Sequence, residues 1–579
     1  KEESSPALRA LAIKTASQVS LKPYTDLSFQ VVPLALRDND LTVKRAACFA
    51  VLRLYQYDSK RTIKSGLIDE LNDFLYSLSP TLVANALAAL SAITEQDPDL
   101  NLKIDKRHAF TLVTNLDKTN EWCQLYILAA FLLYVPQTQN DAVALIEKII
   151  PLLQRESSAI VLGSLRAIVY LLNYVEAPHL VFPSLAKRLG LQLALLLSKP
   201  AEIQFLVLRN VILLLLSKRG LVSFEVSTFF CSYDDPIYIK DTKLEILYLL
   251  ANEQNVGIVL RELEEYATEV DVAMVRKAIR AIGNLAVKLT SAADQCMDVL
   301  MELSSSGIPY VIQECVIIFK NILRRYPGQF TEYIPSFLKY SAIIEEELDL
   351  KASLIWILGQ YGALIANTED LLDELTENFV DEVDIVQLIL LTAVTKFYIQ
   401  DTRKGEKLVL RLMKSATEEV DNPDVRERGF MYWRLISIDP GESGEELQKF
   451  SKQVILSSDL TISTNNDNID PQILEELELN IGTLASIYLK PVQSVFRLSK
   501  KKVLVNSPAL QERVIVEHTF DSTDNLGAPD SLNNLSSTTE LNRSRFAPKS
   551  PLNFSSGSLF DEENLREPEK KSLARRLTN

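Results

Sequence analysis

Few residues of this sequence combine the types and spacing that chemistry at a site requires. The three histidines, His108, His179 and His518, lie far apart, and no HExxH, G-x-S-x-G or GxxxxGK[ST] run is present. The five cysteines are also widely separated without a CxxC pair, which indicates neither a zinc site nor a disulfide framework. The sequence therefore predicts no enzyme, no catalytic residue, no cofactor and no metal.

A cluster of cations, Arg276, Lys277 and Arg280, is the first candidate interaction site. Thr268 and Asp271 precede it and carry side-chain oxygens that suit a helix start. Apolar residues follow at helical spacing on the opposite face: Val272, Val275, Ile279, Ile282 and Ala286. This pattern predicts a helix with a buried stripe and a basic ridge. Gly283 within it predicts that another helix crosses closely there.

The basic ridge (Arg276, Lys277 and Arg280) has two interpretations. It either binds an acidic partner or a membrane phosphoinositide, or it forms ion pairs with acids of the preceding segment, namely Glu262, Glu264 and Glu265. We expect the ion pairs, because the chain contains 76 acidic residues and one ridge produces a weak field among them.

The second candidate is a short motif near the C-terminus that sets two large apolar residues beside three acids: Leu559, Phe560, Asp561, Glu562 and Glu563. Short motifs of this kind dock into grooves of a partner as they become ordered. The alternative is a chance apolar pair in a linker, and the residues alone do not decide between the two.

Length and composition restrict the architecture. The chain has 579 residues, of which 47% are hydrophobic, so it must form several domains or a repeat array. Its net charge of −15 argues against general nucleic-acid binding. The most apolar run, residues 189–216, contains Lys199, Glu202 and Arg209, which favours a pair of buried helices over a membrane span.

A recurring signature decides the fold class. A turn residue is followed by a large apolar residue and then by charged and small residues, with gaps of about 36 to 43 residues, near the period of HEAT and armadillo repeats. The marker positions are Val43, Val83, Trp122, Ile160, Ile203, Ile239, Val275, Val311, Leu350, Val386 and Val425. Two amphipathic helices fit each gap, which predicts an all-α solenoid with a long concave surface. Trp122, Trp356 and Trp433 are expected in its core.

The pattern divides the chain into three parts. Residues 1–440 are the expected HEAT/armadillo-like trunk, and residues 441–491 are expected to close it with C-terminal helices at 446–456 and 471–488. Residues 492–579 are an expected linker with a lone strand at 513–520 and a disordered tail from residue 521, because Ser, Asn, Pro and charge dominate the tail without period.

Several blocks resemble the β-adaptins, the β-type large subunits of the clathrin adaptor complexes. They occur in family order between about residues 6 and 491, and include Glu265–Gly283, Val83–Ser91, Tyr233–Leu247, Trp356–Tyr361, Arg428–Leu435 and Ile481–Tyr488. The resemblance implies a cytosolic trunk that pairs with a second large adaptin and with medium and small adaptor subunits in a heterotetramer. It also implies a hinge that binds clathrin heavy chain, and peripheral association with coated pits or vesicles at the plasma membrane, the trans-Golgi network or endosomes.

This chain departs from the family pattern in three respects. It begins within the repeat array, so we expect the earliest repeats to be missing, and it ends before the appendage that many members carry. Its hinge motif matches the family's clathrin motif at Leu559, Phe560 and Glu563, but Glu562 stands where an apolar residue is expected. The alternatives are an unrelated HEAT scaffold, such as a transport receptor or phosphatase scaffold, and a coatomer-type coat subunit.

Overall fold

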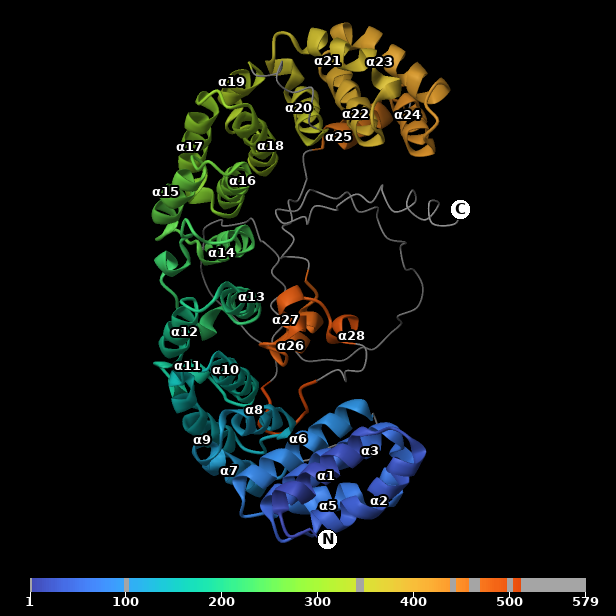
Figure 1. Cartoon of the computed structure of the whole chain (residues 1–579). Coiled ribbons are helices and arrows are strands. Elements are labelled where there is room, and N and C mark those ends of the chain that lie inside the picture. Colours follow the sequence, from blue (N-terminus) through green and yellow to red (C-terminus); the bar gives the residue numbers. More distant parts are fainter. Residues whose placement is uncertain are drawn as a thin grey trace, which may run out of the picture.

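The computed structural model describes residues 3–97, 104–339, 348–437, 444–457, 469–496 and 503–511. These ranges contain helices and no strand, in agreement with the all-α prediction. The helices stack in two layers into a C-shaped arc, with α1 near one end and α24 near the other (Figure 1). The chain is therefore the predicted solenoid, whose repeats contact mainly their neighbours.

The inner layer lines the concave side of the arc and contains one long helix per repeat. It consists of α1 (Pro6–Gln18), α3 (Leu41–Tyr57), α6 (Pro80–Gln96), α8 (Glu121–Ala130), α10 (Ser158–Leu172), α13 (Ala201–Ser217), α14 (Ile237–Leu250), α16 (Val272–Lys288), α18 (Pro309–Arg325), α20 (Leu348–Tyr361), α22 (Asp384–Gln400) and α24 (Pro423–Ile436).

The outer layer is built of shorter helices, often extended by a 3-10 turn. It consists of α2 (Lys22–Leu36), α4 (Ser59–Lys64), α5 (Leu67–Asp73), α7 (Lys106–Asn115), α9 (Gln139–Ile149), α11 (Pro178–Val181), α12 (Leu185–Leu196), α15 (Val256–Tyr266), α17 (Ala293–Ser305), α19 (Ile334–Leu338), α21 (Thr368–Glu377) and α23 (Thr402–Glu418). The remaining helices are α25 (Gly444–Leu456), α26 (Pro471–Glu478), α27 (Leu484–Tyr488) and α28 (Val492–Val495).

The repeat markers confirm the register of the array. Every one of them, from Val43 in α3 to Val425 in α24, lies in the first turn of an inner helix. Most are buried, because this position packs against the neighbouring repeat. Trp122 is the exception: it is 69% exposed, so the expectation that it anchors the core was wrong. Trp433 is also exposed, whereas Trp356 packs against the core as expected.

Glycines end helices at two points of the chain. Gly66 has φ +70° and separates α4 from α5. The helix expected over residues 471–488 is broken at Gly482, which has φ +77° and separates α26 from α27. Both glycines adopt the left-handed region that other residues avoid.

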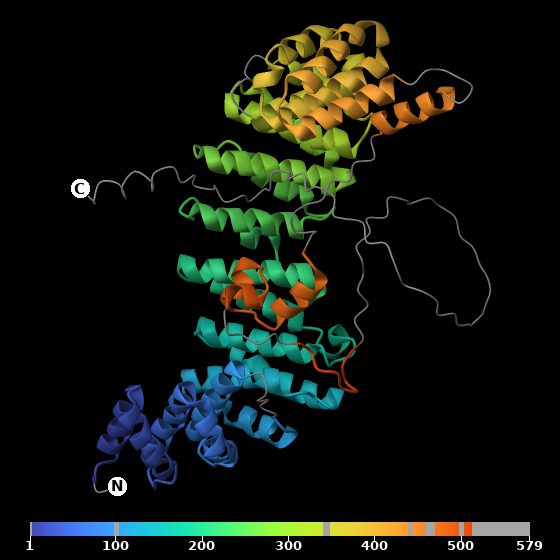
Figure 2. The same ribbon diagram turned by 90° about the vertical axis from the view of Figure 1, so that its right-hand side faces the viewer.

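The C-terminal helices do not all close the end of the trunk. α25 packs there against α22 and α24, whereas α26 and α27 pack against α13 in the middle of the arc. They lie inside the arc in two perpendicular views (Figures 1 and 2). The run over residues 189–216 forms α12 and α13 as predicted, and no described helix is long and apolar enough to cross a membrane. The expected strand and tail lie outside the described residues.

Candidate functional site

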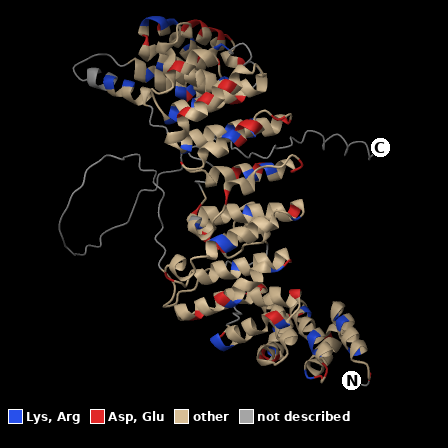
Figure 3. Cartoon of the chain, turned by 90° about the vertical axis from the view of Figure 1, so that its left-hand side faces the viewer, with Lys and Arg blue, Asp and Glu red and all other residues tan. Residues whose placement is uncertain are grey.

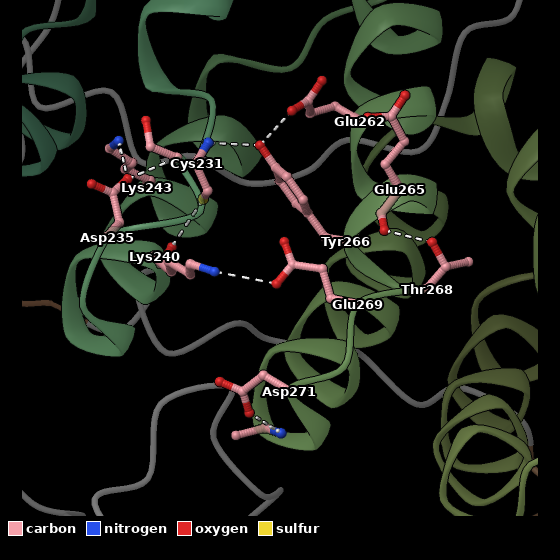
Figure 4. A network of polar contacts seen from close by, with 12 residues as sticks. Cys231, Asp235, Lys240, Lys243, Glu262, Glu265, Tyr266, Thr268, Glu269 and Asp271 are labelled. Carbon is pink, nitrogen blue, oxygen red and sulfur yellow. Dashed lines mark hydrogen bonds and ion pairs between the residues drawn. The ribbon is translucent and has the colours of Figure 1, made fainter.

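The basic ridge lies on α16, as the sequence predicts. Asp271 caps this helix by accepting a hydrogen bond from the Ala273 amide at 2.9 Å. Thr268 does not cap it, because its hydroxyl donates to the Glu265 carbonyl at 2.8 Å (Figure 4). The predicted close crossing at Gly283 is confirmed: a Cβ there would lie 2.2 Å from Ile318 Cγ2 on α18.

The ridge forms ion pairs, but with other acids than those expected. Arg280 donates through Nε and Nη2 to the fully buried carboxylate of Glu314 on α18, at 2.8 Å each. Arg276 Nη1 lies 3.7 Å from the same carboxylate, and Lys277 pairs with Asp241 on α14. Burial raises the pKa of Asp241, and the hydrogen bond from Lys277 opposes this rise.

The expected partners Glu262, Glu264 and Glu265 were wrong because they lie on α15 in the outer layer, whereas the ridge faces the neighbouring inner helices. Glu262 instead accepts a hydrogen bond from Tyr266 at 2.6 Å (Figure 4). The ridge therefore links three consecutive inner helices, α14, α16 and α18.

Similar polar links follow the inner layer along the arc. Each joins a cation to the adjacent inner helix or its preceding turn: Arg209–Glu245, Lys277–Asp241, Arg280–Glu314, Lys320–Ser353, Lys351–Glu382 and Lys396–Gln360. On the side of the ribbon that Figure 3 shows, Lys and Arg are interspersed with Asp and Glu along the described helices. The described trunk therefore uses these cations mainly to connect its own repeats.

The concave face holds a second candidate site, where α26 and α27 dock. The buried side chains of this docked segment (residues 471–496 and 503–511) are mostly apolar and include Leu477, Leu479, Ile481, Ala485 and Val492. Fully burying a side chain such as Leu477 or Ile481 contributes about 1.5–3 kcal/mol before ordering costs. These side chains belong to the same hydrophobic cluster as the trunk, so apolar packing holds the segment on α13 and α10.

Polar side chains of the trunk bind the backbone of the docked segment. Arg166 on α10 donates Nε–H to the Leu479 carbonyl at 2.7 Å, just beyond the C-terminus of α26. Arg209 on α13 donates to the Ile487 carbonyl at 2.7 Å, in the last turn of α27. Cations at helix C-termini are favourable because the carbonyls there are free and the helix dipole is negative.

Two further contacts fix the orientation of the segment. Asn210 accepts a hydrogen bond from the Gly482 amide at 3.0 Å, at the left-handed turn between the two helices. Lys218 Nζ lies 3.3 Å from the carboxylate of Glu478, which is almost fully buried. The site therefore recognises backbone groups at a turn as well as one acidic side chain.

Burial has a clear electrostatic effect on the two arginines. It lowers the pKa of Arg166 to about 10, opposed by Glu95, and it lowers the pKa of Arg209, opposed by Glu245. Arg166 remains protonated at neutral pH. An arginine within an apolar helix is the feature of the sequence that could have predicted this site. From the sequence, Arg209 was used only as an argument against a membrane span, and Arg166 was not identified.

The last described stretch, residues 503–511, continues the contact toward α10. Tyr174 donates its hydroxyl to the Val505 carbonyl at 3.1 Å, and the Gln511 amide donates to the Asn173 carbonyl at 3.3 Å. Ser507 donates to the Pro136 carbonyl at 2.9 Å. The docked segment thus reaches from α13 to the loop before α9.

The other residues considered from the sequence do not form a further site. Among the described residues, no three His, Cys, Asp or Glu side chains are arranged to hold a metal ion. All five cysteines are free, and burial raises the pKa of Cys231 to about 12. The motif Leu559, Phe560, Asp561, Glu562 and Glu563 lies outside the described residues.

Comparisons with known proteins agree with this architecture. Residues 2–440 match the family model described as the adaptin N-terminal region. A chain in a homology model of the full-length AP-3 complex in an intermediate open conformation has a similar fold, with a TM-score of 0.50 and 16% identity over 75% of this chain and 79% of that chain.

Sequence relatives define the branch of the family. The chain is 40% identical to the AP-2 complex subunit beta of Saccharomyces cerevisiae over 513 residues, which cover 87% of this chain and 72% of the relative. It is 36% identical to the AP-1 complex subunit beta-1 of Mus musculus over 85% of this chain, but spans only about half (51%) of that relative. This chain therefore belongs to the adaptin family and, within it, to the β-adaptins.

Proposed function

We propose that the chain is the large β subunit of a heterotetrameric clathrin adaptor complex, where it acts as a scaffold for cargo selection and coat assembly. The observation that carries this proposal is the 40% identity to an AP-2 complex subunit beta, which extends over 87% of this chain. In this role the chain associates with a second large adaptin and with medium and small adaptor subunits. It joins membranes peripherally, through the complex.

The same proposal assigns the chain no catalytic turnover. The cations of the inner layer are engaged in links between repeats, and the histidines His108 and His179 lie in separate repeats. A scaffold needs a stable extended surface and no reacting group. The complex would act on the cytoplasmic face of coated pits or vesicles, at the plasma membrane or at the trans-Golgi network and endosomes.

Clathrin heavy chain is the further partner proposed, bound through Leu559 and Phe560. Two adjacent apolar residues next to Asp561 and Glu563 fit a groove that takes apolar side chains at its floor and acids at its rim. Glu562 weakens this contact, because a carboxylate would occupy a position suited to an apolar side chain.

Affinity purification of the tagged full-length protein tests the assignment. Co-elution of medium and small adaptor subunits with a second large adaptin supports it. Co-elution of karyopherin cargo or of coatomer subunits instead would identify one of the alternatives. Microscopy of the same tagged protein would show whether it works at the plasma membrane or at the trans-Golgi network and endosomes.

A further inference from the structure

The packing of the inner layer has one discontinuity, between α10 and α13. From α1 to α10 and again from α13 to α22, each inner helix packs extensively against the next one, as α3 does against α6 and α16 against α18. α10 and α13 pack directly against each other far less than the other neighbours do. Because a solenoid is stabilised by contacts between adjacent repeats, this junction is the weakest point of the inner layer.

The chain that connects the two repeats is also irregular. Between α10 and α12 it contains only the four-residue helix α11 and a left-handed residue, Ala177, with φ +46°. Leu180 in this connection is 74% exposed. A short irregular connection between two helical blocks is the usual form of a hinge.

The docked segment bridges this junction. α26 contacts both α10 and α13, and α27 contacts α13. On one side Arg166 binds the Leu479 carbonyl, and on the other Arg209 binds the Ile487 carbonyl, both at 2.7 Å. The segment therefore supplies the contact between repeats that the two helices do not make directly.

The docked segment also takes part in the polar contact that joins the α10 side of the junction directly to the α13 side. Lys218 after α13 donates to Asn173 Oδ1 after α10 at 2.7 Å, and the same ammonium lies 3.3 Å from Glu478. The buried carboxylate of Glu478 thus holds Lys218 in place. Residues 505 and 511 add contacts to Tyr174 and Asn173 on the α10 side.

We propose that the junction between α10 and α13 is a hinge of the solenoid and that residues 471–496 and 503–511 act as a clamp that fixes its angle. With the clamp docked, the arc is continuous and its curvature is set. With the clamp released, the block from α1 to α10 moves relative to the block from α13 to α24. This inference concerns the chain itself and does not depend on the proposed function.

Distances between spin labels in the complete chain test the clamp. Labels introduced through non-canonical amino acids at Lys148 on α9 and Arg261 on α15 span the hinge, whereas labels at Arg261 and Lys414 on α23 do not. Both positions of each pair are exposed. The double variant Leu477→Asp and Ile481→Asp places two charges in the core of the docked segment, and Leu484→Asp, at a 51% exposed position of the same segment, is the matched control.

We expect the double variant to broaden the Lys148–Arg261 distance distribution at least about twofold and to leave Arg261–Lys414 unchanged, while Leu484→Asp changes neither. Hydrogen exchange of the α26 amides verifies that the segment has been released, and exchange of the α16 to α22 amides verifies that the trunk remains folded. An unchanged Lys148–Arg261 distribution after release, or equal broadening of the two pairs, would overturn the clamp.

Discussion

Arg166 donates a hydrogen bond to the carbonyl of Leu479 over 2.7 Å, although 313 residues separate the two in the sequence. The contact brings the C-terminal end of the adaptin trunk back to the middle of its own concave face. Arg166 is half-buried there, and its guanidinium binds this carbonyl in place of water.

Arg166→Met should loosen the docked segment, because methionine keeps the apolar stem but donates no hydrogen bond. The loss of a charge-assisted hydrogen bond predicts a decrease of about 1.5–3 kcal/mol in the opening free energy of the α26 amides. Hydrogen exchange measures this directly. Arg188→Met, on the exposed side of α12, is the control and should leave α26 unchanged.

Gly283→Ala should destabilise the trunk despite the better helix propensity of alanine. A Cβ at 2.2 Å from Ile318 forces α16 and α18 apart, at a cost of about 1–3 kcal/mol. The measurement is the thermal unfolding midpoint. Gly257 in α15 has open space around it, so Gly257→Ala should raise the midpoint slightly. In an Ile318→Ala background, where the clashing methyl group is gone, Gly283→Ala should no longer lower the midpoint. An equal decrease in that background would refute the steric explanation.

Glu314→Gln should weaken the link between α16 and α18. The amide keeps the shape of the carboxylate but cannot accept both charged hydrogen bonds of Arg280, which predicts a loss of about 1.5–3 kcal/mol from the free energy of unfolding. Glu302→Gln, at an exposed position of the neighbouring α17 and without an ion pair among the described residues, is the control. Equal effects of the two substitutions would mean that the ridge does not connect these repeats.

Lys320 predicts a specific pH dependence. Burial lowers its pKa to about 8, and the nearby Arg324 adds to this effect. The unfolded chain binds the Lys320 proton more tightly than the folded chain does. Burying the charged lysine therefore lowers the free energy of unfolding by its full amount below pH 8, and this loss disappears as the pH rises to about 10.5. Lys320→Met should therefore raise the thermal unfolding midpoint, relative to the unchanged chain, most strongly near pH 7. This increase should become smaller toward pH 10. Lys187→Met, at an exposed position, should show no such trend.

The C-terminal motif makes a prediction about clathrin. In a pull-down with the tail as bait, Leu559→Ala combined with Phe560→Ala should abolish recovery of clathrin heavy chain, because the apolar contact is lost. Glu562→Leu should increase recovery several-fold, since it completes the apolar pattern. If neither change alters recovery, the motif is a chance apolar pair.

The sequence was sufficient for the periodic part of the fold. Repeat markers such as Val275 and Val311 lie at the same helical position of successive repeats, so local pattern and tertiary packing agree there. The cap at Asp271 and the close approach at Gly283 were also predictable, since each depends on a local requirement of the backbone.

The long-range contacts were not predictable from the sequence. The partners of Arg280 and Lys277 depend on which face of α16 points along the array, and sequence proximity suggested Glu262 in the outer layer instead. Nothing local in Leu479 or Gly482 indicates that they meet Arg166 and Asn210. Docking of the segment depends on the curvature of the whole arc, which is a global property.

The mass of the native assembly is the most direct test of the central claim that this chain is the β subunit of an adaptor complex. Native mass spectrometry of the tagged protein purified from its own cells should give one particle that contains a single copy of this chain with one second large adaptin, one medium and one small subunit. A particle without medium and small adaptor subunits, or one composed of karyopherin cargo or coatomer subunits, would contradict the account.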